Sequence, residues 1–328
     1  MKFGPVAVTD AEGAVLAHSV ALSKGRLRKG HVLTTSDLDK LADAGVAQVI
    51  VARLDADDVD ENTAAAALAQ AVAGRARGLS LSNAFTGRCN LIADGPGCVT
   101  LDVAALEAVN GGDPMITIAT VAPLQQMAKG GMVATIKIIA YGVPKDALQR
   151  ACTAGTDAIG FCAPQLRGAT LIISQISGGA GDKGQAAIAG RLDALDVALE
   201  EVITVPHTRD AIAGAIAAAR SELVLILTGS ATSDSEDVAP SALRAAGGRV
   251  ERFGMPVDPG NLLFLGAHNG RHVIGLPGCA RSPALNGADW VLGRVICGLP
   301  VTSADIAGMG VGGLLKEIPT RPQPRRGR

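Results

Sequence analysis

The stretch from residue 222 to residue 247 constrains the fold more than any other part of the chain. It begins with Leu-Val-Leu-Ile-Leu at 223–227, a run that is apolar on both faces and rich in branched side chains. Such a run is typical of a strand buried in a sheet that is covered on both sides. A loop of small, hydroxyl and acidic residues follows at 228–237, and a helix is predicted from Asp237. The stretch therefore predicts a strand, a loop and a helix in that order.

The same alternation of strands and helices extends from about residue 168 to residue 299. A hairpin is also predicted at 261–278, because Asn269-Gly270 between two apolar runs is the strongest short hairpin signal. The pattern predicts an α/β domain of three layers, in which a parallel-rich sheet lies between helices, with ligands bound outside the carboxyl ends of the strands. The other predicted strands are 169–176, 200–207 and 250–257, and the other predicted helices are 185–195, 208–221 and 282–298.

The first 150 residues lack this regular alternation and predict a smaller, mixed α+β region. Residues 1–53 indicate a small β-rich unit, and residues 54–150 indicate a second unit of helices and strands. The α/β domain is expected over 151–300, followed by a C-terminal tail at 301–328. A chain of 328 residues exceeds the usual size of one core, so several domains are expected.

Composition excludes several classes of protein. A net charge of −1 with 19% charged residues argues against a nucleic-acid or membrane-surface protein. Hydrophobic residues make up 48% of the chain but aromatic residues only 2%, so the core must consist of Ala, Val, Leu and Ile. The sequence has no apolar run of about 20 residues and no expected signal peptide. Its six cysteines form no close pair, which favours reduced thiols and a cytoplasmic location.

Four segments rich in small residues are predicted to meet at one ligand site. They are 177–184, 228–237 and 275–282, with 257–262 ahead of the hairpin. Small residues let a ligand approach the backbone, and N–H groups at a helix start favour anions. Asp234 and Asp237 could hold a metal ion or act as bases. The alternative is that these are ordinary loops of a doubly wound fold, with acidic residues that only cap a helix.

The motifs of this region resemble the molybdopterin-binding domain. That family comprises molybdopterin adenylyltransferases, molybdopterin molybdotransferases, gephyrin and the competence-damage-inducible proteins. Residues 228–240 are similar to the adenylyltransferase loop and align Asp237, Val238 and Pro240 with it. Residues 259–262, the hairpin and 275–282 are similar to the molybdotransferase motifs, as is the segment around Arg26 to Val51. The resemblance covers about 130 residues, by count from the sequence.

The resemblance implies the molybdopterin-binding fold and a molybdotransferase-like protein of molybdenum cofactor biosynthesis. Its ligand would be molybdopterin or adenylylated molybdopterin, with Lys183 and Arg281 holding the phosphate. Asp234 and Asp237 would be the catalytic residues and would manage Mg²⁺ and molybdate. The remaining binding residues implied are Gly181, Asp182, Gly229, Ser230, Thr232, Ser233, Pro259, Gly260, Asn261, Pro277, Gly278 and Ser282.

Several positions depart from the family pattern and bear on catalysis. Ser230 and the pair Ala231-Thr232 replace a glycine and a Thr-Gly pair, while Asn261 and Asp258 replace a lysine and an arginine. These losses favour an alternative in which the protein binds the cofactor without catalysis and delivers it to a molybdenum enzyme or a nucleotidyltransferase. A nucleotide pyrophosphatase on the same fold is a third alternative. The family also implies a homo-oligomer.

Overall fold

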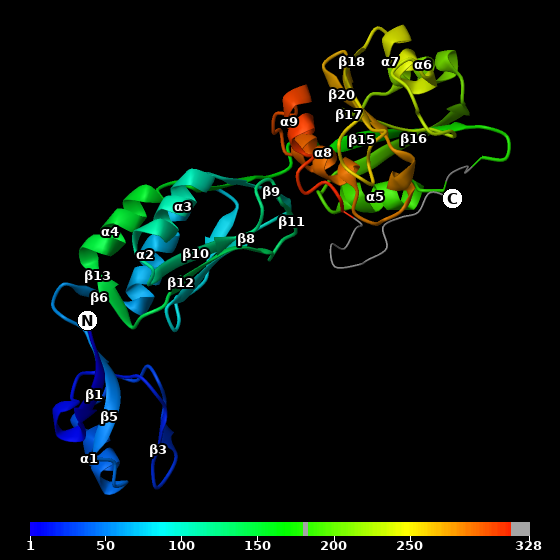
Figure 1. The fold of residues 1–328 in the computed structure, drawn as a ribbon. Helices are drawn as coiled ribbons and strands as arrows, with labels where there is room; N and C mark the ends of the chain where they lie inside the picture. The colour runs from blue at the N-terminus through cyan, green and yellow to red at the C-terminus, as the bar shows by residue number, and fades with distance from the viewer. Residues whose placement is uncertain (180–182, 316–328) are drawn as a thin grey trace. The chain divides into compact units, whose positions relative to one another are not determined.

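The computed structural model describes residues 1–179 and 183–315, and these form two compact units (Figure 1). The first unit contains Met1–Asp94, Val99–Pro123 and Lys129–Phe161. The second contains Gly95–Cys98, Leu124–Ala128 and the described residues from Cys162 onward. No helix in the described ranges is long and apolar enough to cross a membrane.

The first unit begins with a small antiparallel sheet of order β1-β5-β2. Leu16, Leu41 and Val51 pack in its core, which joins helix α1 to one face of this sheet. Its elements are β1 (Lys2–Ala7), η1 (Val8–Asp10), β2 (Val15–Leu16), β3 (Val20–Ala21), β4 (Arg26–Leu27), α1 (Thr35–Asp43) and β5 (Gln48–Arg53).

A second, four-stranded antiparallel sheet of order β10-β12-β8-β7 completes the first unit. Its helices are rich in alanine, a strong helix former, and α2 buries its apolar face through Leu68 and Val72. The elements from residue 58 to residue 162 are β6 (Asp58–Asp60), α2 (Glu61–Ala73), β7 (Leu79–Leu81), β8 (Arg88–Ala93), β9 (Gly97–Leu101), α3 (Val103–Gly112), β10 (Ile116–Thr120), β11 (Gln126–Met127), β12 (Met132–Ile138), β13 (Gly142–Pro144), α4 (Lys145–Ala154) and β14 (Ile159–Cys162).

The second unit is built on a six-stranded sheet of order β16-β15-β17-β20-β19-β18. The first four strands in this order run parallel, and β19 runs antiparallel to both of its neighbours. The elements are β15 (Gly168–Gln175), α5 (Gln185–Asp193), β16 (Ala198–Pro206), α6 (Arg209–Ala218), β17 (Leu223–Leu227), α7 (Val238–Ala245), β18 (Arg249–Phe253), β19 (Phe264–His268), β20 (Arg271–Leu276), η2 (Gly278–Arg281), α8 (Gly287–Ile296) and α9 (Ser303–Gly308).

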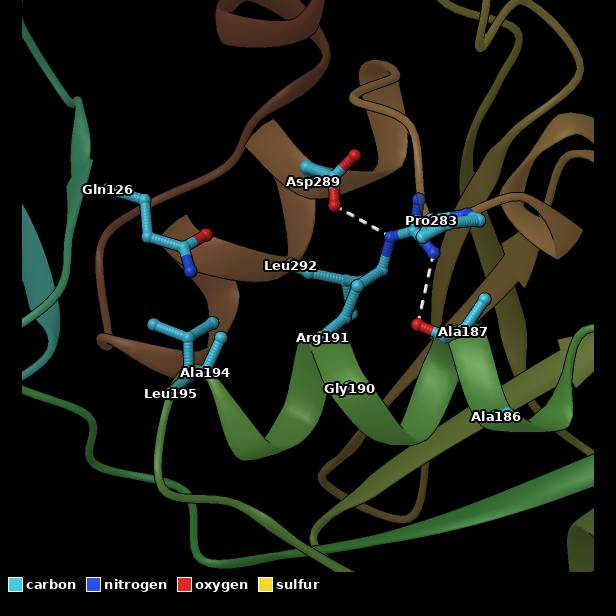
Figure 2. A pocket seen from close by; sticks show the side chains of 10 residues that line it. All are labelled: Gln126, Ala186, Ala187, Gly190, Arg191, Ala194, Leu195, Pro283, Asp289 and Leu292. Carbon is cyan, nitrogen blue, oxygen red and sulfur yellow. Dashed lines mark hydrogen bonds and ion pairs between the residues drawn. The ribbon is translucent and has the colours of Figure 1, made fainter.

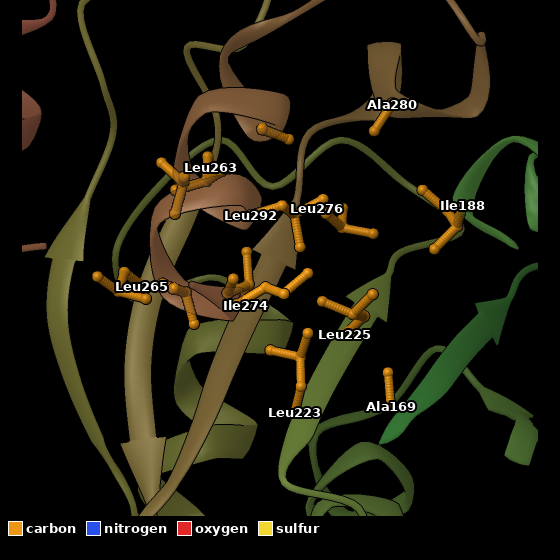
Figure 3. Close-up of a cluster of buried hydrophobic side chains, with 14 of the residues drawn as sticks. Ala169, Ile188, Leu223, Leu225, Leu263, Leu265, Ile274, Leu276, Ala280 and Leu292 are labelled. Carbon is orange, nitrogen blue, oxygen red and sulfur yellow. The ribbon is translucent and has the colours of Figure 1, made fainter. Parts of the chain in front are cut away.

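Helices cover both faces of this sheet, which confirms the predicted three-layer α/β fold. On one face Ile188 of α5 and Leu292 of α8 join Leu223, Leu225 and Ile274 in one apolar cluster (Figure 3). Ile306 of α9 belongs to the same cluster. On the other face α6 and α7 pack on Val224 and Ile226. All five residues of β17 are buried, because the strand lies between β15 and β20.

The predicted hairpin is also confirmed. β19 and β20 pair with His268 opposite Arg271, and the turn residues Asn269 and Gly270 have φ angles of 49° and 76°. Two consecutive positive φ angles are what a tight hairpin turn requires. The hairpin brings the chain back to the centre of the sheet, so that β20 ends beside β17.

Candidate functional site

Three loops of the second unit leave the carboxyl ends of neighbouring parallel strands. The loop after β15 has its described residues at 176–179 and 183–184. The loop after β17 covers 228–237, and the segment after β20 runs from Pro277 to Asn286. The sequence placed the third loop at 275–282, but Gly275 and Leu276 belong to β20. The shift arises because a buried glycine in a strand resembles a loop residue in sequence.

Arg281 holds the three loops together. One terminal nitrogen of its guanidinium donates to the Lys183 carbonyl, and the other, Nη2, donates to the Thr228 carbonyl at 2.7 Å. Gly184 approaches so closely that a Cβ atom there would lie 2.8 Å from the Arg281 Cα. Burial lowers the pKa of the Arg281 guanidinium, but the group stays charged at neutral pH. A cation therefore sits where all three loops meet.

Backbone N–H groups in the 228–237 loop remain available to a ligand. The Thr228 hydroxyl donates to the Ser230 carbonyl at 2.6 Å and lies 3.5 Å from the Thr232 hydroxyl, which orders the start of the loop. Within the described ranges, the N–H groups of Ser230, Ala231 and Thr232 have no hydrogen-bond partner. Successive free N–H groups of this kind suit an anion.

Among the residues that the structure describes, the first N–H groups of helix α5, beside Arg281, have no hydrogen-bond partner. Its N-cap is Gly184, which has no side chain to accept from the first turn. The N-caps Thr208, Asp237 and Asn286 of the later helices α6, α7 and α8 each accept from the backbone. The start of α5 therefore keeps its N–H groups and the positive end of its dipole for another partner.

Asp237 is the N-cap of α7. Its Oδ1 accepts from the Val238 N–H at 2.7 Å, and its Oδ2 accepts from the Ser233 N–H at 2.9 Å. The Ser233 N–H does most to hold the pKa of the Asp237 carboxyl below its ordinary range, and the Val238 N–H lowers it further. Asp237 therefore caps a helix, as the alternative interpretation of the sequence predicted. A further role of this carboxylate toward a ligand stays a prediction.

The second acidic residue of the loop, Asp234, is exposed and accepts from the Glu236 N–H at 2.8 Å. No group of three or more His, Cys, Asp or Glu side chains that could hold a metal ion is found in residues 1–179 and 183–315. Two carboxylates that already accept backbone N–H groups make a poor cage for a cation. The predicted metal role of Asp234 and Asp237 therefore rests on the resemblance alone.

The Pro259-Gly260-Asn261 segment lies against the start of α8. The Asp258–Pro259 peptide bond is cis, and the Pro259 carbonyl accepts from the Gly287 N–H at 2.8 Å. Gly260 has a φ of 144°, and a Cβ there would lie 2.7 Å from the Gly287 nitrogen. Asn261 is exposed, and its amide donates to the Met255 carbonyl at 3.4 Å.

Three of the remaining predicted residues lie in or beside the segment that follows β20. Pro277 is buried at the end of β20, whereas Gly278 and Ser282 are exposed in the segment that carries Arg281. Gly181 and Asp182 lie outside the described residues.

Two residues that the sequence reasoning missed connect the strand ends. Ser174 is fully buried at the end of β15, and its Oγ lies 2.8 Å from Nδ1 of His207 and accepts from the Gly229 N–H at 3.1 Å. His207 follows β16 directly. Its position at the carboxyl end of a parallel strand was the one signal in the sequence that could have marked it.

Arg191 of α5 stabilises the segment that carries Arg281. Its guanidinium donates to the Asp289 carboxylate at 2.7 Å and to four backbone carbonyls, among them those of Ala280 and Ser282. Figure 2 shows this side chain among the residues that line a cavity between α5 and α8. The volume of the cavity is about 350 Å³. The 228–237 loop does not line this cavity, so the cavity is separate from the free N–H groups described above.

Comparison with known proteins identifies this region. Residues 166–292 match the family described as "Probable molybdopterin binding domain", and residues 5–53 match a domain of unknown function. No curated protein matches the chain.

The solved structures that are similar to the chain include the following two. The protein CinA with unknown function from Thermoplasma acidophilum is 19% identical, with 35% of this chain and 90% of that chain covered and a TM-score of 0.26. The molybdopterin biosynthesis protein MoeA from Pyrococcus horikosii is 11% identical, with 94% and 76% covered and a TM-score of 0.28. Both TM-scores are low, so the assignment of the domain rests on the family match.

Proposed function

We propose that the domain at 166–292, which belongs to the molybdopterin-binding family, holds molybdopterin or its adenylylated form in molybdenum cofactor biosynthesis. The observation that carries the proposal is the position of Arg281. Its guanidinium lies between the three loops at the carboxyl edge of the sheet, next to the uncapped start of α5.

The phosphate of the ligand is the group best matched by these residues. Arg281 supplies a positive charge, and the N–H groups of Ser230, Ala231 and Thr232 supply donors without a partner. Lys183 is exposed beside Arg281 and adds a second cation. Each charge-assisted contact to an anion is worth roughly 1.5–3 kcal/mol, so this set can hold a phosphate without the lysine that Asn261 replaces.

Molybdopterin, when bound, supplies the dithiolene that receives molybdenum. The residues of this chain would bind the phosphate, orient the pterin and hold the 228–237 loop through Asp237. Asp234, the exposed carboxylate of the same loop, is the residue we assign as a base during transfer. The proposed activity is therefore molybdotransferase-like.

A non-catalytic delivery protein is the second candidate. The positions that favour it are Asn261 and Asp258, which stand in place of two family cations. The expected partner would be a molybdenum enzyme or a nucleotidyltransferase. The predicted cytoplasmic location and homo-oligomer stay predictions.

A turnover assay separates the two candidates. Purified protein is incubated with molybdate and either molybdopterin or adenylylated molybdopterin, and molybdenum-loaded pterin is measured over time. Formation in excess over protein supports the molybdotransferase. Stoichiometric binding without turnover supports delivery, and no binding of either pterin contradicts both.

A further inference from the structure

His207 lies among the residues of the candidate site but has no role in the proposed function. It follows β16, and its N–H donates to the Gln175 carbonyl at 2.9 Å, which fixes it beside the end of β15. The side chain is half-buried, and its Nδ1 lies 2.8 Å from Ser174 Oγ. The ring is therefore held by both its backbone and its side chain.

Ser174 connects His207 to the residues that follow β17. Its side chain is 0% exposed, and its Oγ accepts from the Gly229 N–H at 3.1 Å. Gly229 lies so close to β15 that a Cβ there would be 2.8 Å from the Ser174 carbonyl oxygen and 3.1 Å from the Ile176 nitrogen. The side-chain contacts thus run from β16 through β15 to the first turn of the 228–237 loop.

One arrangement of the hydrogens satisfies both contacts of Ser174. A serine hydroxyl has one proton and two lone pairs, and one lone pair of Ser174 is taken by Gly229. The remaining proton is donated to Nδ1 of His207 when the imidazole is neutral and carries its own proton on Nε2. No buried polar atom of Ser174 or His207 is then left without a partner, which is the favourable state for a buried network.

We propose that His207 is a positioning residue for the pterin phosphate site, an inference that rests on the proposed function. Through Ser174 it sets where the Gly229 N–H lies, and Gly229 directly precedes the free N–H groups of 230–232. Loss of the acceptor at Nδ1 frees the Ser174 hydroxyl to rotate. The 228–237 loop then begins from a less defined position.

The test compares three variants with the unmodified protein. His207→Ala removes the acceptor, Ser174→Ala removes the hydroxyl, and His207→Asn places an amide oxygen on the same Cγ position as Nδ1. Hydrogen exchange of the Gly229 amide is measured without ligand, and molybdopterin released from a molybdenum enzyme is the binding probe. Protection of Gly229 and affinity should each fall about tenfold in both alanine variants, the loss of one net hydrogen bond. His207→Asn should restore most of both.

Each of the other outcomes contradicts one part of the proposal. Unchanged hydrogen exchange at Gly229 in His207→Ala overturns the positioning role. Restored exchange without restored affinity in His207→Asn overturns it as well, because the imidazole would then contact the ligand itself. A double variant that loses affinity by the product of the two single effects contradicts a shared network. Failure of the unmodified protein to bind molybdopterin overturns the proposed function, while the exchange result still decides whether His207 sets the Gly229 N–H.

Discussion

Replacement of Arg281 tests the centre of the candidate site, because this side chain joins loops from three strands. Its guanidinium donates to the carbonyls of Lys183 and Thr228. Hydrogen bonds from a charged donor contribute about 1.5–3 kcal/mol each when buried, and the half-buried position of Arg281 reduces this by solvent screening. We therefore expect Arg281→Ala to lower the free energy of unfolding by about 1.5–3 kcal/mol in total.

The effect on ligand binding is expected to be separate from the effect on folding. Arg281→Ala should weaken molybdopterin binding by about ten- to a hundredfold, with a clear dependence on salt, because a charge facing the phosphate is lost. Arg281→Lys is the matched control. It keeps the charge, but one ammonium cannot span two carbonyls as a planar guanidinium does. The lysine variant should therefore keep much of the affinity and lose part of the stability.

Urea unfolding and calorimetric titration measure the two effects. Trp290 is the single tryptophan of the chain and lies in α8, so its fluorescence reports on the second unit. Unchanged unfolding and unchanged affinity in Arg281→Ala would refute the role of Arg281 in joining the three loops. A lysine variant as weak in binding as the alanine variant would show that geometry, not charge, holds the ligand.

Three further predictions concern the loop, its neighbour and the core. Asp237→Ala should cost about 0.5–2 kcal/mol at neutral pH, because the cap of α7 is lost. Since the folded pKa of this carboxyl is lowered, its charge stabilises the fold above the ordinary carboxyl range, and this contribution fades as pH falls through the folded pKa. The difference in stability between the two proteins should therefore shrink in acid, and a difference that stays constant with pH would contradict a charged cap. Gly260→Ala should cost about 2–4 kcal/mol because its Cβ meets the Gly287 backbone; the control Gly214→Ala in α6 has open space and should be neutral or stabilising, and equal thermal shifts would reject the steric reasoning. Leu225→Ala should lower unfolding free energy by about 2–5 kcal/mol in urea, and a loss below about 1 kcal/mol would mean that β17 is not central to the core.

The second unit was largely predictable from the sequence because its signals are local. Residues 223–227 are apolar on both faces and are buried in the middle of the sheet. Asn269-Gly270 needs two positive φ angles, and the structure has them. Such features depend on a few neighbouring residues, so they can be predicted without knowing which distant segments of the chain come into contact.

The contacts of the site could not be predicted, because they join residues far apart in the chain. Ser174 and His207 are 33 positions apart, and Arg281 reaches a carbonyl 53 positions away. The grouping of Gly95–Cys98 and Leu124–Ala128 with the second unit is equally non-local. Sequence placed Arg281 in a ligand loop, but its hydrogen bonds to two other loops depend on the register of the parallel strands.

Titration of the protein with molybdopterin tests most directly whether the loops joined by Arg281 form the ligand site. Pterin fluorescence is followed as purified protein is added, and the titration is repeated with Arg281→Ala. We expect saturable binding of one pterin per domain at 166–292, weakened about ten- to a hundredfold by the substitution and weakened also by added salt. Absence of saturable binding, or binding of equal strength in both proteins, would contradict the assignment of the ligand site to the loops held by Arg281.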